Sequence, residues 1–513
     1  MSTRLFITTA IDYVNGRPHL GHAYEKVLTD MLARYARRKG QEVFFLTGVD
    51  EHGMKVQQSA EKAGRAPQDL ADENAAHFRA LYDQLGISYD DFVRTTEPRH
   101  KEVVRRILSQ LHASGDIYEG TYEGYYSAKQ EQFLTEADQV NGAWPEVYGD
   151  VIRLSEKVYY FRLSKYQQPL LDFLRDHPDW IFPSFRVREV LGALDKPIPD
   201  LCISRPVSRL SWGIPLPFDE TQVTYVWFDA LINYISVVEQ TGGGLNHWWP
   251  ALHVIGKDIM VPAHAIYWPI MLMAADLPLP RRLLVHGFWT LNHTVMSKST
   301  GNVIDPLALM EVYGRDAFRY YVMREMALGQ DADFSADSFH QRYQSELGNN
   351  LGNLLNRTIS MIGRYREGVV PVCHGLDPAE ESLRDDLMSS ISTYRELMDQ
   401  WQIHLALTEL WKAITRANQY IEASAPWKLA KDPASSARLD TVLHHMAASL
   451  WLLAGELSPL LIDSASGILR QLNVRDFLPH ESSVTWPSGF DGVTVGTPEP
   501  LYPRIERESS PAA

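Results

Sequence analysis

RLFITTAIDYVNGRPHLGHAYEKVLTDMLARYARRKGQEVFFLTG, residues 4–48, contains the pattern from which the fold can be predicted. The short apolar run at 4–9 is typical of a buried strand, and apolar positions recur at helical spacing over 22–38. A second short apolar run follows at 41–48. A strand, a helix and a strand in close succession predict a βαβ unit, and therefore a parallel sheet with a right-handed crossover.

The same pattern returns far downstream. Strands are predicted at 251–258 and 281–287, with a helix at 264–275 between them. Polar residues stand at or just beyond the carboxyl ends of the predicted strands, the edge where open α/β sheets bind ligands; they are Asp12, Asp50, His52, Lys257, Asp258 and His286. Strand ends are commonly solvated, which explains one such residue more easily than the whole set.

The composition excludes several classes of protein. A chain of 513 residues is too long for one compact core, so more than one domain is expected. The formal net charge of −15 argues against a general nucleic-acid coat, although it leaves room for a local basic face. Cys202 and Cys373 are the only cysteines, so neither a disulfide framework nor a four-cysteine zinc site can be built. This cysteine usage suits a reducing compartment, and we expect a cytoplasmic location.

The rest of the chain divides by its residue patterns. The window at 259–275 is uncharged but short, and it contains prolines, so we expect a buried helix there and no membrane segment. Residues from about 346 onward place leucine and isoleucine at helical spacing, which predicts a helical bundle. The expected organisation is a parallel-sheet domain at 1–114 and 225–325, an inserted domain at 115–224, a linking region at 326–345, a helical domain at 346–480 and a surface tail at 481–513.

The segment GRPHLGHAYEK at 16–26 lies between the first strand and the first helix. Gly21 would let a ligand come close to the backbone where a side chain would obstruct it. A helix N-terminus offers unpaired N–H groups and a partial positive charge, which suit a polyphosphate. His19 and His22 would then direct imidazole donors at that phosphate, although so short a motif also fits two incidental surface histidines beside a packing glycine.

A second polar segment, VMSKSTGN at 295–302, follows the strand predicted at 281–287. Its small, polar and glycine residues are typical of a loop. Lys298 could bring an ammonium group to a phosphate, where the attraction at about 4 Å is on the order of 4 kcal/mol at intermediate dielectric. A solvated loop lysine is the simpler interpretation of this segment alone, and the HLGH segment makes that interpretation weaker.

These two segments resemble the signature motifs of class I aminoacyl-tRNA synthetases. Further stretches are similar to the methionyl-tRNA synthetases in particular: TGVDEHG at 47–53, ISRPVSRLSWGIPLP at 203–217, YVWFDALINY at 225–234, IGKDI at 255–259 and APWKLAK at 425–431. The resemblance extends from the start of the chain to about residue 505. It implies an α/β fold, in which a Rossmann-type parallel-sheet catalytic domain is split by an inserted connective domain. A stem-contact or linking region and an α-helical bundle that binds the anticodon would follow.

The resemblance also implies the reaction. L-Methionine and ATP, with Mg²⁺, would give methionyl adenylate and pyrophosphate, and tRNA(Met) would then receive the methionyl group. Little covalent chemistry by the protein is needed, so positioning and charge stabilisation would supply the rate. The residues that match the family's catalytic positions are His19, His22 and Lys298, and those that match its ATP site are Tyr13, Gly21, Gly256, Asp258, Ser297 and Lys298.

Methionine needs an anchor for its ammonium group and an apolar slot for its thioether. Asp50 suits the first role. The positions that resemble the family's amino-acid pocket are Ile11, Tyr13, Trp227, Ala230, Leu231, Tyr234, Ile259 and His264. Aromatic rings near sulfur contribute about 0.3 to 1.5 kcal/mol, although each of these residues alone is more often found in an ordinary core.

The helical part carries the positions that match the family's contacts with the CAU anticodon. They are Asn353, Arg357 and Trp427. Asn353 and Arg357 stand four apart, hence on one helical face. Stacking and hydrogen bonding to unstacked bases suit these residue types, although Trp427 also fits the core of a bundle.

The chain departs from the family pattern in three places. Val295 stands where the second motif usually begins with a lysine; an exposed lysine contributes about 1 kcal/mol or less, so Lys298 is expected to support catalysis. Many relatives have a cysteine zinc knuckle in the inserted domain, whereas this neighbourhood offers Ser127, Gln130, Trp144 and Tyr148. No zinc is therefore expected. The segment KDIMVPAH is one residue longer than the common spacing, which affects the register of Ile259 and Ala263.

Two alternatives remain beside this interpretation. One is a different HxGH nucleotidyltransferase, which would share the ATP chemistry but would usually be shorter and would have no anticodon-type bundle. The other is a tRNA-binding regulator that has kept the fold and lost catalysis, for which Val295 is the only indication. The chain also ends without the dimer-forming domain that some relatives append, and we expect a monomer.

Overall fold

The computed structural model describes residues 4–127, 129, 132–134, 136–296, 303–481 and 483–506. Contacts divide the chain into two compact units. The first comprises Met1–Pro18, Val43–Asp83 and Ser88–His286, and the second comprises His19–Glu42, Gln84–Ile87 and Gly287–Ala513. Among the described residues we find no helix with the length and apolar character of a membrane span.

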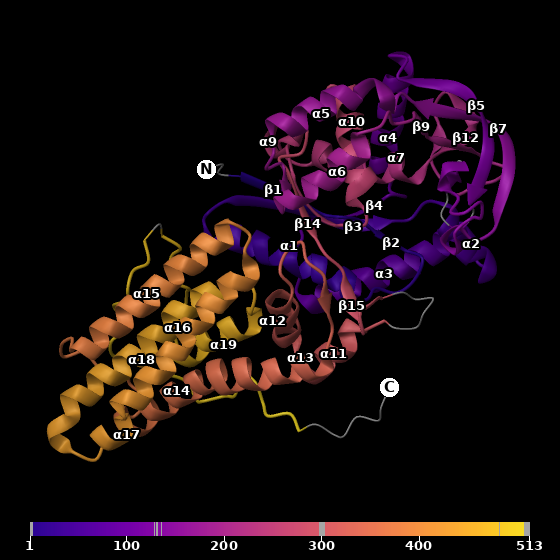
Figure 1. Ribbon diagram of the computed structural model, residues 1–513. Helices are drawn as coiled ribbons and strands as arrows, with labels where there is room; N and C mark the ends of the chain where they lie inside the picture. The colour runs from indigo at the N-terminus through magenta and orange to yellow at the C-terminus, as the bar shows by residue number, and fades with distance from the viewer. Residues whose placement is uncertain are drawn as a thin grey trace. The chain divides into compact units, whose positions relative to one another are not determined.

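The first unit is built on a parallel sheet (Figure 1). The strands lie in the order β2-β3-β1-β13-β14-β8, and β4 also pairs with β3. Their bounds are β1 Arg4–Thr9, β2 Asp12–Tyr13, β3 Glu42–Asp50, β4 Asp91–Arg94, β8 Ile181–Phe182, β13 Leu252–Gly256 and β14 Arg282–His286. The pairs β2–β3, β3–β4, β1–β13, β13–β14 and β14–β8 are all parallel. Strands from the two predicted halves therefore share one sheet, which confirms the predicted fold class.

The central strands are apolar because the sheet is buried. β13 is buried along its whole length, as expected for a parallel strand covered on both faces. The helices of the chain up to residue 286, besides α1, are α2 Met54–Lys62, α3 Pro67–Leu85, α4 Pro98–Ala113, α5 Gln167–Asp176, α6 Val187–Leu194, α7 Val226–Ala230, α8 Asn233–Ser236, α9 Gly244–Trp248 and α10 Trp268–Ala274.

Two predicted helices have different bounds in the structure. α1 runs over Leu20–Arg38 and so begins earlier than predicted. The helix predicted at 264–275 is a π-helical turn, η6 (Met260–Tyr267), followed by α10. Within η6 the N–H of His264 donates to the carbonyl of Ile259, five residues back, at 3.1 Å. Val261 within η6 has non-helical torsion angles, φ −111° and ψ 125°, so the segment before α10 is kinked and is not a continuous helix.

The inserted stretch forms antiparallel sheets. One has the order β6-β5-β7-β9, in which β5 (Ile117–Ser127) and β7 (Val151–Phe161) make a long ribbon (Figure 1) and β6 (Gln132–Leu134) and β9 (Leu201–Cys202) flank it. The other has the order β10-β12-β11 over Ser204–Pro206, Asp219–Thr224 and Pro215–Leu216. Trp144 contacts Tyr125 and Tyr148, with ring centroids 4.9 and 6.4 Å apart. Gln130 lies outside the described residues.

The second unit is mainly helical. Its helices besides α1 are α11 Pro306–Tyr313, α12 Arg315–Glu325, α13 Ala336–Arg342, α14 Asn353–Arg366, α15 Pro378–Asp399, α16 Ile403–Ser424, α17 Pro426–Leu429, α18 Ser436–Leu457 and α19 Ile462–Leu472, with a π-helical stretch, η7, at Tyr343–Gly352. A small sheet consists of β15 Trp289–Leu291 and β16 Thr294–Val295, which come before α11, and β17 Ala332–Asp333, which lies between α12 and α13. α14, α15, α16 and α18 pack side by side (Figure 1) and bury the predicted apolar stripe, Leu354, Leu355 and Ile359 among it. The predicted bundle, here called the helical bundle (α14–α19), is therefore present.

A fully buried arginine fixes α1 within the second unit. Arg319 on α12 pairs with Asp30 of α1, Nη2 to Oδ2, at 2.7 Å. Its other N–H groups donate to the carbonyls of Leu460 at 2.8 Å, Pro459 at 3.1 Å and Leu85 at 3.2 Å. Because a buried charge is stable only when paired and hydrogen-bonded, these contacts specify one arrangement of the segments involved.

Candidate active site

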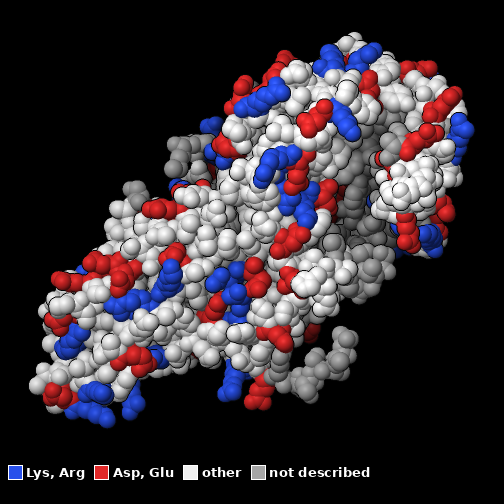
Figure 2. Space-filling view, viewed as in Figure 1, with Lys and Arg blue, Asp and Glu red and all other residues white. Residues whose placement is uncertain are grey.

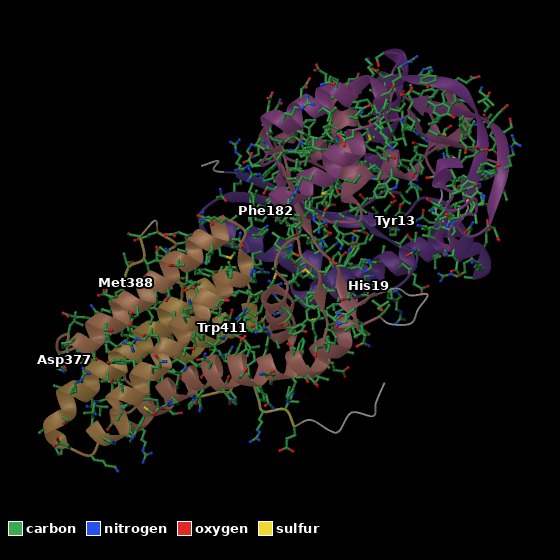
Figure 3. The ribbon with its side chains drawn as sticks, viewed as in Figure 1. Tyr13, His19, Phe182, Asp377, Met388 and Trp411 are labelled. Atoms are coloured by element: carbon green, nitrogen blue, oxygen red, sulfur yellow. The ribbon has the colours of Figure 1, made fainter. Side chains whose placement is uncertain are left out.

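The HLGH turn forms the start of α1, and His19 is its N-cap residue (Figure 3). The Nδ1 atom of His19 accepts the N–H of Gly21 at 3.1 Å, and the Nδ1 atom of His22 accepts the N–H of His19 at 3.0 Å. Since a backbone N–H can only donate, both Nδ1 atoms are acceptors, and the proton of each neutral ring lies on Nε2. The turn therefore fixes two neighbouring imidazoles, 3.9 Å apart between ring centroids, with Nε2–H as the donor of each.

A side chain at position 21 would crowd His19, which is a reason for glycine that the sequence did not indicate. A Cβ atom at this position would lie 3.0 Å from Cε1 and 3.2 Å from Nδ1 of His19. These contacts are tighter than most side chains tolerate, so a larger residue would displace the imidazole ring. Gly21 thus keeps His19 in its capping position, whether or not a ligand also approaches the backbone there.

The VMSKSTGN segment is described only in part. Ser297 and Lys298 lie outside the described residues, whereas the chain on either side of them is described. Ile304, which follows the segment, accepts the N–H of Leu20 at 3.2 Å. Trp289 on β15 lies edge-on to Tyr24 of α1, with ring centroids 6.2 Å apart. The chain that flanks the second motif therefore contacts the first turns of α1, as expected if both motifs serve one nucleotide.

Asp50 lies at the end of β3 with its side chain buried, and the residue is 3% exposed. The parallel register of β2 and β3 pairs Tyr13 with Asp50, and the N–H of Val14 donates to the Asp50 carbonyl at 3.2 Å. Figure 3 marks Tyr13 on β2. The sheet therefore places a buried carboxylate beside an aromatic ring, which suits an ammonium group attached to an apolar molecule.

A series of ring contacts continues from Tyr13. Trp227 is edge-on to Tyr13 and to His264, with centroid distances of 6.5 and 6.4 Å. Nδ1 of His264 lies 2.9 Å from the Ile259 carbonyl and must donate to it, so Nε2 accepts the hydroxyl proton of Tyr234 at 2.8 Å. The rings of Tyr13, Trp227, His264 and Tyr234 are therefore held in defined orientations, and the bond to Ile259 fixes His264 relative to that residue.

The remaining predicted pocket residues are placed as follows. Ala230 and Leu231 are buried. Ile259 packs against the same hydrophobic cluster as Leu231 and Tyr234, whereas Ile11 packs against a separate cluster around Phe6 and Phe44. The structure thus groups Ile259 with the rings and puts Ile11 in different surroundings.

Gly256 is the last residue of β13, and Asp258 lies two residues beyond it. A Cβ atom at Gly256 would lie 2.5 Å from Oδ1 of Asp258, so glycine leaves room for this exposed carboxylate. The N–H of Lys257 donates to the carbonyl of His286 at 3.0 Å, which ties the ends of β13 and β14 together. Lys257 and His286, two of the polar residues expected at strand ends, are therefore neighbours, whereas Asp12 is paired with Val49 and not with Asp50.

Asp229 is not among the residues predicted from the sequence, yet it lies at the centre of a buried network. The residue is 1% exposed, and its two oxygens lie 2.6 Å from His52 Nδ1 and 2.7 Å from His100 Nε2. Burial acts to raise the pKa of this carboxyl, but the two histidines outweigh it and lower the pKa to about 2. His52 and Asp229 stand in stretches that carry the family resemblance, so a signal existed, whereas His100 belongs to no motif.

Two of the predicted anticodon residues, Arg357 and Trp427, contact each other at one end of the helical bundle. Arg357 on α14 pairs with Glu422 on α16, Nη1 to Oε1, at 2.6 Å, and its guanidinium carbon lies 5.5 Å from the centre of the Trp427 ring. Trp427 is only partly buried, so it is not a core residue of the bundle. Asn353 begins α14, one turn before Arg357. Figure 2 shows Lys and Arg side chains gathered at this end of the bundle, where α17 lies.

The described residues contain no evident metal centre. No group of three or more His, Cys, Asp or Glu side chains among them is arranged to hold an ion. Cys202 is buried and Cys373 is partly buried, and neither is in a disulfide.

Comparisons with known proteins cover nearly the whole chain. A family model of class I tRNA synthetases (M) matches residues 5–153 and 147–359, and a model of the anticodon binding domain of methionyl tRNA ligase matches residues 370–512. The methionine–tRNA ligase of Caldanaerobacter subterraneus is 40% identical over 517 residues, which cover 100% of this chain and 81% of that protein. The Bacillus subtilis enzyme is 40% identical over 521 residues, which cover 98% and 78%.

Solved structures give the same result. Mycobacterium tuberculosis methionyl-tRNA synthetase in complex with methionyl-adenylate superposes with a TM-score of 0.91 at 37% identity, over 98% of this chain and 100% of that one. The apo form of the same enzyme gives 0.85 at 34% identity, over 99% of both chains. Sequence and fold therefore agree along the chain.

Proposed function

The chain belongs to the methionyl-tRNA synthetase family of class I aminoacyl-tRNA synthetases, and we propose that it binds methionine at Asp50 and the phosphates of ATP at the HLGH turn. The protein is a methionine–tRNA ligase, which activates L-methionine with ATP and transfers the methionyl group to tRNA(Met). Two groups of side chains would divide this reaction between them, one for the amino acid and one for the nucleotide.

The pairing of Tyr13 with Asp50 is the observation that carries the methionine site. The substrate's ammonium group would lie against the Asp50 carboxylate, because a buried anion stabilises a cation that has lost its water. Its thioether would enter the slot formed by Trp227, His264 and Tyr234, where ring edges favour sulfur. Ala230, Leu231 and Ile259 would supply apolar walls, whereas the role expected for Ile11 is not supported, since it packs against the separate cluster around Phe6 and Phe44.

The fixed Nε2–H groups of His19 and His22 support the ATP site. They would donate to the phosphate oxygens, with Lys298 and Ser297 acting from the VMSKSTGN segment. Gly21, beside His19 at the start of α1, would leave the backbone open to the nucleotide. Mg²⁺ would neutralise part of the phosphate charge. Tyr13, Gly256 and Asp258 would contact the adenosine, the last through its exposed carboxylate.

These groups would act by positioning. A carboxylate oxygen of methionine attacks the α-phosphorus of ATP, the bond to the bridging oxygen breaks, and pyrophosphate leaves. Positive charge and N–H donors at the phosphates then stabilise the charge that develops there. In the second step a hydroxyl of the 3′-terminal ribose of tRNA attacks the methionyl carbonyl, and AMP leaves. None of these steps needs a covalent bond to the protein.

Three further features belong to the proposal. The inserted domain would fold without zinc, since the aromatic contacts around Trp144 occupy the neighbourhood of the expected knuckle. The protein would be a monomer. It would act in the cytoplasm, because aminoacylated tRNA is used in translation there.

Amino-acid-dependent exchange of pyrophosphate into ATP tests the assigned function. We expect exchange with L-methionine, and a rate lower by at least about tenfold with leucine or isoleucine, because one or two misplaced groups in an apolar slot cost about 1–3 kcal/mol. Exchange that depends on another amino acid would contradict the assigned substrate. Absence of exchange with every amino acid would instead favour a regulatory tRNA-binding protein.

We propose that Arg357, Trp427 and Asn353 contact the anticodon, and their replacement tests this. Arg357→Ala and Trp427→Ala should each lower kcat/KM for tRNA(Met) by about tenfold or more, because stacking on one base contributes about 1–3 kcal/mol. Pyrophosphate exchange without tRNA should not change.

Arg416→Ala is the matched control for this experiment. Arg416 also lies on the helical bundle and pairs with a carboxylate, Asp386, at 2.6 Å. If this variant loses as much tRNA charging as Arg357→Ala, general positive charge rather than anticodon contact explains the effect.

A further inference from the structure

The turn that follows β3 is held from several directions. It comprises residues 50–53 and is here called the DEHG turn. The N–H of Glu51 donates to Oγ1 of Thr95 at 3.0 Å, and its carboxylate accepts from Arg94 Nε at 2.7 Å. The N–H of Gly53 donates to the Trp212 carbonyl at 3.1 Å. Side-chain contacts as well as backbone contacts therefore hold the conformation of this turn. Asp50 is its first residue, so the same contacts also hold Asp50 in place.

Asp229 connects this turn with the helix that carries Trp227. It accepts His52 Nδ1 at 2.6 Å from within the turn, and it lies two residues after Trp227 on α7. Its other oxygen accepts His100 Nε2 on α4 at 2.7 Å, and His100 Nδ1 contacts Ser236 Oγ on α8 at 2.9 Å. One buried carboxylate therefore joins the turn, α7 and α4.

An uncharged replacement cannot reproduce these contacts. A carboxylate accepts on both oxygens, whereas an asparagine of the same shape has one acceptor and one donor group. One of the two imidazoles would then face an N–H instead of an oxygen. That imidazole must change tautomer to accept the N–H, or else leave a buried donor without an acceptor at a cost of about 1–3 kcal/mol. The charge-assisted contact that holds the turn is lost in either case, so the turn would shift.

We propose that Asp229 is a positioning residue of the methionine site, which sets the DEHG turn through His52 and so fixes the distance between the Asp50 carboxylate and the Trp227 ring. This inference rests on the proposed role of Asp50. It assigns a function to a carboxylate that touches neither substrate, because its contacts are His52 and His100.

Asp229→Asn in the full-length protein tests the inference by pyrophosphate exchange. KM for methionine should rise about tenfold, since a small displacement of a binding group has effects of this order. KM for ATP and kcat should stay within about twofold, because a displaced ammonium anchor weakens ground-state and transition-state binding alike. A fall in kcat with unchanged KM for methionine would overturn the inference.

Asp116→Asn is the matched control. Asp116 is also a buried carboxylate with a charged partner, Lys165, at 2.6 Å in the inserted part of the chain. Its replacement should change stability but not KM for methionine. An equal rise in KM with this variant would show that Asp229 acts only through general stability.

His52→Gln removes the other partner of the contact between His52 and Asp229. It replaces the first test if Asp229→Asn fails to fold. It should raise KM for methionine to a similar extent, and the double variant should be no worse than either single one, because both break one connection. Multiplying effects would overturn the inference. Asp50→Asn separates the two proposals: if it leaves KM for methionine unchanged, the proposed anchor fails, whereas a change with Asp50→Asn but none with Asp229→Asn removes only the positioning role.

Discussion

Asp50→Asn should raise KM for methionine by about 100-fold or more. The carboxylate is buried beside Tyr13, so the substrate's ammonium group would exchange its water for this one anion. Removing one partner of a buried, hydrogen-bonded charge pair costs about 2–5 kcal/mol, and about 2.7 kcal/mol corresponds to about 100-fold. Pyrophosphate exchange at varied methionine measures the effect, and KM for ATP should change little.

A ligand without the amino group makes this test specific. Binding of 4-(methylthio)butanoate, which is methionine without its ammonium group, should be as weak in the variant as in the unaltered protein. If Asp50→Asn weakens both ligands equally, the carboxylate supports the shape of the pocket and does not bind the ammonium group. Asp116→Asn again shows the effect of losing a buried carboxylate elsewhere.

His19→Ala and His22→Ala should each lower kcat of pyrophosphate exchange by about 10²- to 10³-fold. Each ring offers its Nε2–H because the backbone occupies Nδ1, and losing one preorganised donor at a developing negative charge has an effect of this size. The KM for methionine should be nearly unchanged. A variant that retains kcat would exclude that histidine from the phosphate site.

His19→Asn separates phosphate binding from helix capping. Asparagine is a good N-cap residue, so its side chain can replace the imidazole that accepts the N–H of Gly21. We expect thermal stability near that of the unaltered protein and a kcat as low as that of His19→Ala. Alanine should also lose about 0.5–2 kcal/mol of stability, since the cap is gone. Recovery of kcat in His19→Asn would mean that His19 acts as a cap alone.

The HLGH turn shows why α1 could be predicted from the sequence although its first residue, Leu20, could not. The apolar spacing within α1 is regular and independent of the rest of the fold, so the helix itself could be predicted. Its cap is a histidine, whereas helix starts are usually marked by Ser, Thr, Asp or Asn. Without that signal the boundary depended on the first apolar positions. β1 has no such difficulty, because its apolar run coincides with the strand.

Only those residues of the candidate site that stand in stretches similar to the family could be predicted from the sequence. Asp50, Trp227, Tyr234 and His264 were found because they stand in recognisable stretches. The kinked segment η6 leaves no regular period in a sequence, so the helix at 264–275 was predicted to start later than η6 does. The contact between Asp229 and His52 joins residues 177 positions apart. No local pattern specifies such a pair, and only the folded sheet and helices bring it together.

The buried guanidinium of Arg319 has a consequence for protein engineering. It donates to carbonyls of the turn between α18 and α19, and it pairs with Asp30 of α1, the helix that His19 caps. A chimaera that exchanged the helical bundle for that of a relative would leave this cation with unsatisfied donors unless the turn at Pro459 and Leu460 kept its shape. Truncation before this turn would do the same, so the anticodon-reading part of the chain is not a separable module. A shortened enzyme designed for methionine activation alone would need a new partner for Arg319.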